Sequence, residues 1–180
     1  VDHALIIGAN LRLEQPMINH RLRKAQLSGA NITALNVKEF DYNYALNHVS
    51  VAPNEIATIL AGVLKIVLEK KSIELPEYLS AISPSSSSVE LAKDLLNAER
   101  PVILLGEHII NNKQAASIAQ LIVEIAKQVG ANTLNLSISA NALGAQHVNF
   151  VPNSVGMNAN EMFKAEMRAF LLLDVYPEYD

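Results

Sequence analysis

The chain has 180 residues, of which half are hydrophobic and 18% charged, with a net charge of −4 and no cysteine. This composition indicates a globular domain, excludes disulfides and thiolate metal sites within these residues, and argues against a nucleic-acid surface. The longest apolar run, residues 56–68, is too short to cross a bilayer and contains Lys65, so we expect no direct membrane insertion.

The first predicted element is a buried strand that runs into a tight turn and a helix. Residues 5–7 form an apolar run without alternation, which is typical of a strand covered on both faces in a parallel sheet. Gly8 permits a sharp turn, Pro16 suits the first turn of a helix, and Gly29 is expected to end that helix. A second strand over 32–37 then completes a βαβ unit with a right-handed crossover.

The middle of the chain is predicted to be a polar loop, a buried helix and a connector. Residues 38–52 form the loop, and Pro53 opens a helix that is apolar on more than one side. The serine-rich residues 83–88 allow two interpretations, a domain boundary or a surface loop that leads into a helix. We favour the surface loop, because Ser87 and Glu90 fit a capping box.

The second half of the chain repeats the opening pattern. An apolar strand over 102–105 precedes Gly106, and a long helix follows, which Asn111 or Asn112 is predicted to cap and Gly130 to end. The two halves therefore look like two βαβ units, an arrangement that is common in dinucleotide-binding folds.

The remaining residues are predicted to hold two further strands. One covers 133–136 and the other 170–173, with a short helix from about Asn160 before the last strand. Residues 137–160 are rich in asparagine and nearly free of charge. A loop of that length in a compact domain is typically a binding or packing loop.

Together these elements predict an α/β fold with three layers, in which a mostly parallel, five-stranded, Rossmann-like sheet carries helices on both faces. Residues 1–180 are expected to form a single Rossmann-like domain of two βαβ halves, about 1–80 and 87–180. Because the chain opens on Val1 just before one core strand and closes on Asp180 just after another, we expect it to be an excised piece of a larger protein.

The sequence contains no catalytic constellation. Its five histidines are scattered without metal-ligand spacing, and it has no G-x-S-x-G elbow, Walker loop or G-x-G-x-x-G motif, so we predict no catalytic residue and no metal ligand. The one candidate site is the first turn, where Gly8, Asn10 and Arg12 are placed to meet a phosphate at a helix N-terminus. In the alternative interpretation, Gly8 is only a tight turn and Asn10 bonds its own backbone.

A basic group, formed by Arg21, Arg23 and Lys24, lies beside the apolar stripe of the first helix. It is either a solvated helix face or a contact with an acidic neighbouring domain. The sequence leaves both interpretations open.

Residues 8–25 read Gly-Ala-Asn-x5-Pro-x4-Arg-Leu-Arg-Lys-Ala. This run is similar to the Gly-x-Asn-Pro…Pro…Arg-Leu-Arg-Lys-Ala signature of the molybdopterin oxidoreductase superfamily, although Leu11 stands where the signature has proline. Within that superfamily the chain most resembles a family of iron–sulfur subunits of bacterial NADH:quinone oxidoreductase, respiratory complex I. Further stretches that resemble this family are Phe40-Asp41-x-x-Tyr44, residues 100–106, Asn141-x-x-Gly144-Ala145 and residues 171–180.

The resemblance implies a structural role for these residues. In the molybdenum enzymes of the superfamily, the first turn lies against a pterin guanine dinucleotide, whereas the complex I family keeps the fold and generally lacks that cofactor. Gly8, Asn10 and Arg12 would then form a vestigial dinucleotide turn, with no cofactor and no activity in this segment. Iron–sulfur clusters are expected elsewhere in the parent subunit, because this segment has no cysteine.

The resemblance also implies a location and partners. The partners would be other domains of the same iron–sulfur subunit and other subunits of the peripheral arm, on the cytoplasmic side of the bacterial inner membrane. The whole complex would transfer electrons from NADH to quinone. Two alternatives stay open: a working molybdopterin guanine dinucleotide-binding domain of a molybdenum oxidoreductase, and the central domain of a thiamine-diphosphate enzyme, in which residues 100–106 would also fit.

Overall fold

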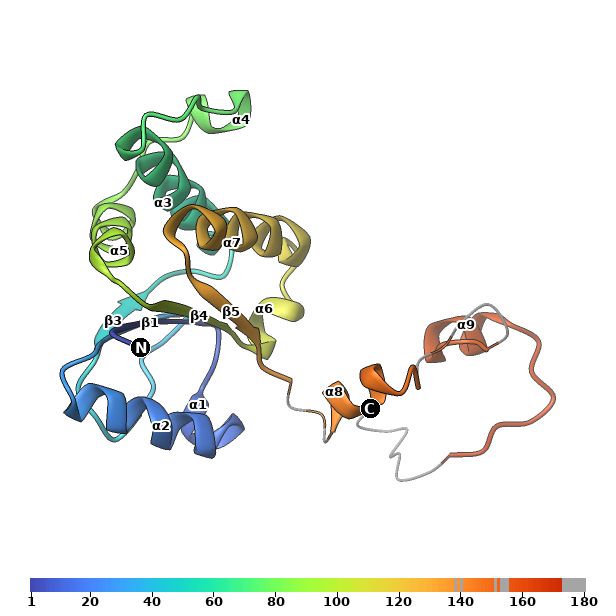
Figure 1. Cartoon of the computed structure of the whole chain (residues 1–180). Helices are drawn as coiled ribbons and strands as arrows, with labels where there is room; N and C mark the ends of the chain where they lie inside the picture. Colours follow the sequence, from blue (N-terminus) through green and yellow to red (C-terminus); the bar gives the residue numbers. More distant parts are fainter. Residues whose placement is uncertain (138, 140, 151, 153–155, 173–180) are drawn as a thin grey trace. The chain divides into compact units, whose positions relative to one another are not determined.

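The computed structural model describes residues 1–137, 139, 141–150, 152 and 156–172. The chain divides into two compact units, Val1–Ile138 and Ser139–Asp180, and each is described by itself. Among the described residues of the first unit, five strands form one sheet: β1 (His3–Ile7), β2 (Asn31–Asn36), β3 (Asn47–Ser50), β4 (Pro101–Leu105) and β5 (Asn132–Asn135). Their order is β3-β2-β1-β4-β5, and every neighbouring pair is parallel (Figure 1).

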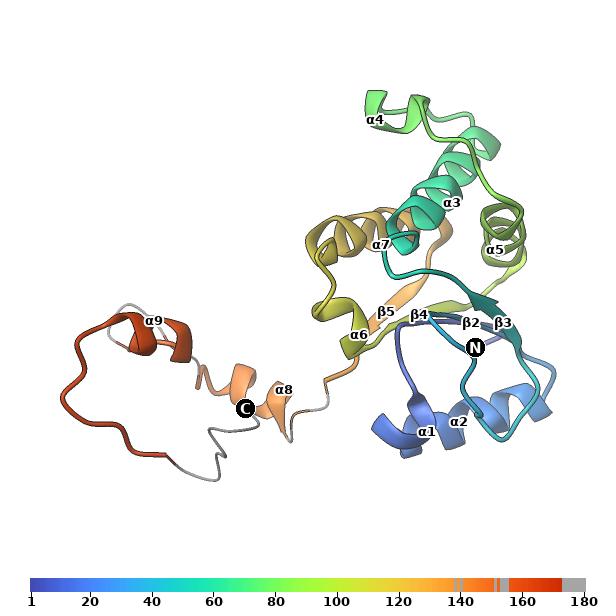
Figure 2. The same ribbon diagram turned by 180° about the vertical axis from the view of Figure 1, so that it is seen from behind.

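Helices cover both faces of this sheet. One face carries α1 and α2, and the other carries α3, α5 and α7, as the two opposite views show (Figures 1 and 2). The bounds are α1 (Leu11–Glu14), α2 (Pro16–Leu27), α3 (Ile56–Lys70), α4 (Glu77–Ser80), α5 (Ser86–Asn97), α6 (Glu107–Ile110) and α7 (Ala115–Val129). The predicted three-layer α/β fold with a five-stranded parallel sheet is therefore confirmed.

The apolar run of β1 explains why the sheet needs helices on both faces. Ala4 and Ile6 pack into the cluster on the α2 side, whereas Leu5 and Ile7 pack into the larger cluster with α3, α5 and α7. All five residues of the strand are buried. Because successive side chains point to opposite faces, a strand buried on both sides has no polar alternation.

The contact between α3 and α5 is close because Gly62 has no side chain. Ser88 donates a hydrogen bond from Oγ to the carbonyl of Ile59 at 3.0 Å, and a Cβ at Gly62 would lie 2.6 Å from that oxygen of Ser88. The N-cap of α5 is Ser85, whose hydroxyl accepts from the N–H of Ser88 at 3.2 Å.

Two predicted helix caps were wrong. The capping box proposed for Ser87 and Glu90 does not form, because α5 begins two residues earlier than that box requires. Asn111 and Asn112 do not cap the long helix either. An additional short helix, α6, follows β4 and ends at Ile110 with Asn111 as its C-cap, and α7 begins after Gln114.

One strand lies where the sequence predicts a loop, and one predicted strand does not form in its described residues. β3 lies inside the predicted loop 38–52, where its four residues pair with the outer edge of β2. The expected last strand does not form over 170–172, which are irregular and exposed, and Leu173 lies outside the described residues. Pro16 opens α2 as predicted, and Gly29 and Gly130 follow helix ends with φ of +94° and +70°. The helix expected from Pro53 begins three residues later, at Ile56.

The second unit contains two short helices in its described part, α8 (Ala142–His147) and α9 (Ala159–Lys164). The second is the helix expected from about Asn160. It starts with a capping box, in which Asn158 Oδ1 accepts from the N–H of Glu161 at 3.0 Å and the Glu161 carboxylate accepts from the N–H of Asn158 at 2.9 Å. No helix within the described ranges is long and apolar enough to span a bilayer.

Candidate functional site

The turn after β1 begins with Gly8, whose φ of +65° is a conformation that residues with a side chain rarely adopt. Its N–H donates to the carbonyl of Leu35 at 3.1 Å, which ties the turn to the end of β2. A Cβ at Gly8 would also lie 2.7 Å from Cγ1 of Ile109, so both the backbone angle and the available space favour glycine here.

Two buried polar side chains hold the backbone N–H and C=O of the next residue, Ala9. The N–H of Ala9 donates to Oδ1 of Asn36 at 3.0 Å, and the hydroxyl of Tyr42 donates to the carbonyl of Ala9 at 2.6 Å. Asn36 also donates from Nδ2 to the Tyr42 hydroxyl oxygen at 2.8 Å. Burial raises the pKa of Tyr42 to about 12, so its hydroxyl keeps its proton and remains a donor at neutral pH.

The carboxylate of Glu14 lies on the backbone of the turn. It accepts from the N–H of Asn10 at 2.8 Å, while the carbonyl of Asn10 accepts from the N–H groups of Leu13 and Glu14 at 3.0 and 2.9 Å. The side-chain oxygen of Asn10 is buried and has no hydrogen-bond partner among the described residues, so it does not cap α1. A carboxylate at this place favours a hydrogen-bond donor or a cation and repels a phosphate.

Arg12 is the third predicted site residue. Its guanidinium forms an ion pair with the carboxylate of Asp41, and both side chains are exposed. The only cation among the three predicted residues is therefore already matched by a carboxylate of the loop that follows β2.

The loop after β4 is in direct backbone contact with the turn. The N–H of Gly106 donates to the carbonyl of Ile7 at 2.8 Å, and the N–H of His108 donates to the carbonyl of Gly8 at 3.2 Å. A Cβ at Gly106 would lie 2.2 Å from that Gly8 oxygen. Because the strand order reverses between β1 and β4, this is the point at which doubly wound sheets commonly bind ligands. Here the two loops lie against each other.

Sequence reasoning missed Asn36, Tyr42 and Gly106 as parts of this arrangement. Asn36 ends a predicted strand, and an amide at that position was the one available signal, because the carboxyl ends of parallel strands meet at one edge of the sheet. The described residues hold no group of three or more His, Asp or Glu side chains that could bind a metal ion.

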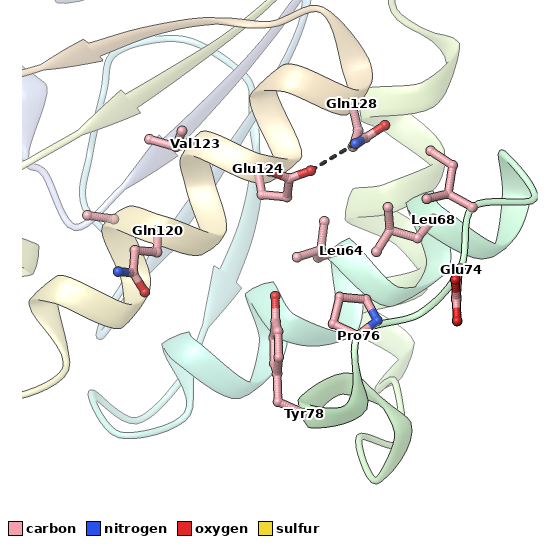
Figure 3. Close-up of a pocket in the computed structure, with 11 residues that line it drawn as sticks. Leu64, Leu68, Glu74, Pro76, Tyr78, Gln120, Val123, Glu124 and Gln128 are labelled. Atoms are coloured by element: carbon pink, nitrogen blue, oxygen red, sulfur yellow. Dashed lines mark hydrogen bonds between the residues drawn. The ribbon is translucent and has the colours of Figure 1, made fainter.

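A separate groove of about 600 Å³ lies between α3, α7 and residues 73–78 (Figure 3). Its residues are Leu64, Leu68, Ile73, Glu74, Pro76, Tyr78, Ala119, Gln120, Val123, Glu124 and Gln128. Gln128 donates to the Glu124 carboxylate at 2.8 Å. The charged residues that line the groove are Glu74 and Glu124, and most of the others are apolar.

Comparisons with known proteins place this geometry in a family. The model of the family described as molybdopterin oxidoreductase matches residues 2–180. The chain is similar to the NADH-ubiquinone oxidoreductase 75 kDa subunit of Reclinomonas americana, with 27% identity over 150 residues, which are 80% of this chain and 18% of that protein.

A solved structure supports the fold. A chain in the formyltransferase/hydrolase complex of Methylorubrum extorquens, determined with methylofuran, superposes with a TM-score of 0.56 at 17% identity. The match covers 82% of this chain and 40% of that one. Since the family model covers nearly every residue, the chain belongs to the molybdopterin oxidoreductase family.

Proposed function

We propose that this chain is a non-catalytic scaffold portion of an iron–sulfur subunit of bacterial NADH:quinone oxidoreductase. The similarity to the 75 kDa subunit supports the kind of parent protein. The observation that carries the scaffold role is the turn after β1, in which the N–H groups of Ala9 and Asn10 and the guanidinium of Arg12 are bound to other groups of the same chain.

The residues of this turn do not fit a pterin guanine dinucleotide. The N–H of Asn10 is bound to the Glu14 carboxylate, the guanidinium of Arg12 is bound to Asp41, and Gly106 lies against the carbonyl of Gly8. A phosphate at this place would meet a partly buried negative charge with no free cation of the turn to offset it. We therefore propose that the chain binds no such cofactor.

Electron transfer from NADH to quinone would belong to the assembled complex. The iron–sulfur clusters would lie elsewhere in the parent subunit, because this chain contains no cysteine. The partners would be other domains of that subunit and other subunits of the peripheral arm, on the cytoplasmic side of the bacterial inner membrane. The chain spans 18% of the length of the Reclinomonas americana subunit, which leaves room for such domains in a parent protein of similar size.

The test is a measurement of cofactor content and nucleotide binding. The natively purified parent subunit should contain no molybdenum by elemental analysis, and millimolar guanosine diphosphate should give no saturable heat on titration. Amide hydrogen exchange at Gly8 should not slow when the nucleotide is added. Molybdenum in the protein, or saturable binding that slows this exchange, would contradict the proposal.

The family description favours one alternative, a working pterin-binding module of a molybdenum oxidoreductase. The same titration separates the two functions. If guanosine diphosphate binds, and if Arg12→Ala abolishes the binding, the nucleotide lies at this turn and the alternative holds. The family model that matches residues 2–180 is that of the molybdopterin oxidoreductases, which disfavours the thiamine-diphosphate alternative.

A further inference from the structure

The outward surface of α2 combines exposed apolar and basic side chains. Met17, His20, Lys24 and Leu27 are spaced by three, four and three residues, so they follow one another along a single helix face. All four are exposed, and the apolar residues at the two ends, Met17 and Leu27, are 71% and 73% exposed. On the opposite face of the helix, Leu22 is buried in the core, and buried Asn19 donates to the carbonyl of Tyr42 at 3.2 Å.

The cations of this helix have no carboxylate partner among the described residues. Arg21, Arg23 and Lys24 are exposed, and none of them forms an ion pair there. The sequence of α2 contains no acidic residue. Three positive charges on one short helix of a chain with a net charge of −4 are therefore left for another molecule to match.

The residue types also favour a protein partner. Arginine and methionine are enriched in the centres of protein–protein interfaces, and a lysine-only face is more typical of free surface. We propose that an acidic surface of a neighbouring subunit or domain docks on α2, with carboxylates on the arginines and an apolar contact to Met17 and Leu27. This inference rests on the proposed scaffold function. The contact surface, called the α2 face below, consists of Met17, His20, Arg21, Arg23, Lys24 and Leu27.

The composition of α2 disfavours a lipid surface as the occupant. A helix that lies in a membrane interface needs a wide apolar face for the acyl chains. The apolar face of α2 is used against the sheet, where Leu22 belongs to the core. The exposed apolar residues, Met17 and Leu27, lie at opposite ends of the helix with basic residues between them. This spacing favours a protein surface whose carboxylates bind the basic residues and whose apolar side chains contact Met17 and Leu27.

A charge-reversal variant of the parent subunit tests the α2 face. The triple variant Arg21→Glu, Arg23→Glu and Lys24→Glu should lower co-isolation with the neighbouring subunits at least about tenfold, because the docked carboxylates would then face like charges.

The matched control keeps the charge change and moves its position. Lys70→Glu, Lys93→Glu and Lys127→Glu reverse three exposed lysines on α3, α5 and α7, the opposite helical layer. This control should assemble like the wild type. Equal assembly of the two triple variants would overturn the inference. Co-isolation of the wild-type parent subunit distinguishes a failure of this inference from a failure of the proposed function. If the wild type co-isolates with no other subunit, the proposed function is wrong.

A cross-linking measurement needs no charge change and therefore does not depend on how the triple variant folds. A photoreactive benzoylphenylalanine at Met17 in the assembled protein should capture a peptide rich in aspartate and glutamate from a neighbouring subunit or domain. The same residue at Val123, on α7, is the control position. Capture of no peptide, or of a peptide without carboxylates, would overturn the inference. Binding to phosphatidylglycerol vesicles that is lost in the α2 triple variant would also overturn it, in favour of a membrane.

Discussion

Two halves of the first unit follow the same plan and differ at the same place. Each has a buried strand, a glycine, a four-residue helix, a long helix and a further parallel strand: β1-α1-α2-β2 and β4-α6-α7-β5. Gly8 is needed for its φ of +65°, whereas Gly106 has an ordinary φ of −93° and is needed because the carbonyl of Gly8 lies so close. A glycine directly after a buried strand is therefore required for two different reasons, the backbone angle at Gly8 and the lack of space for a side chain at Gly106.

The strands that close the two halves also differ. β2 and β5 both end in asparagine, at Asn36 and Asn135. Asn36 is 1% exposed and holds the peptide of Ala9, whereas all residues of β5 are exposed at the edge of the sheet. A residue of the neighbouring strand, Asn36, therefore fixes the first turn by hydrogen bonds. Asn135 has the same side chain but is exposed to solvent.

The largest expected effect is at Gly106. Alanine there would place Cβ 2.2 Å from a backbone oxygen, and backbone cannot rotate away as a side chain can. We expect Gly106→Ala to lower the free energy of unfolding by about 3 kcal/mol or more, measured by urea denaturation of the chain. The control is Gly29→Ala, where φ is +94° but no atom lies within 4 Å of the new Cβ, and which should cost about 1 kcal/mol. Similar losses for the two variants would show that close approach does not matter at Gly106.

The next effect sharpens the comparison of the two asparagines. Asn36→Ala removes the acceptor for the buried N–H of Ala9 and a partner of Tyr42, so it should cost about 2–3 kcal/mol. Asn135→Ala, at the exposed end of β5, should change stability by no more than about 0.5 kcal/mol. Equal effects would mean that the buried hydrogen bonds do not stabilise the turn.

The predictable parts of the fold are those that a short run of residues determines. The central strands were found because burial on both faces leaves an uninterrupted apolar run, as in residues 5–7. β3 was missed because Asn47–Ser50 is a partly exposed edge strand with no such run. The last strand was predicted from an apolar run at 170–173, but residues 170–172, its described part, are exposed in the structure, so the run reflects no burial within the described chain.

The candidate site was predictable only in its local part. The need for glycine at Gly8 follows from the strand and helix on either side of it. The contacts that hold Ala9 come from Asn36 and Tyr42, which are 27 and 33 residues away, and no periodicity signals such a pairing. The phosphate interpretation of Arg12 likewise did not include its ion pair with Asp41, 29 residues away.

A smaller effect on stability is expected at Gly8, where the cost of the left-handed backbone angle can be measured apart from the cost of the contact with Ile109. Gly8→Ala should cost about 2 kcal/mol, partly from the left-handed φ and partly from the side chain of Ile109. In an Ile109→Ala background that contact is gone, and what remains is the backbone cost of about 1 kcal/mol and the 3.3 Å approach to Cβ of His108. Double-mutant cycles measured by urea unfolding give this difference. A cost for Gly8→Ala that is the same in both backgrounds would contradict the role assigned to Ile109.

The smallest effect at neutral pH concerns the first residues of the two strands. β1 opens with His3, which is in register with Pro101 of β4 and whose ring nitrogens have no hydrogen-bond partner among the described residues. Burial lowers the pKa of His3 below its usual 6.5, and the carboxylates of Asp94 and Asp2 oppose this shift only in part. The unfolded chain therefore binds this proton at a higher pH than the folded chain does.

This difference gives His3 a defined pH window. At pH 8 neither state is protonated at this residue, so it contributes no pH dependence; as the pH falls through 6.5, the unfolded chain takes up the proton first and the free energy of unfolding falls. His3→Leu should remove this part of the slope between pH 7 and pH 5, whereas His20→Gln, at an exposed position of α2, should keep it. Pro101, the residue in register with His3 on β4, has no group that titrates, so we expect this pH dependence at the start of β1 and not at the start of β4. If the free energy of unfolding of His3→Leu depends on pH as steeply as that of the wild type, the buried imidazole of His3 is not the source of the pH dependence.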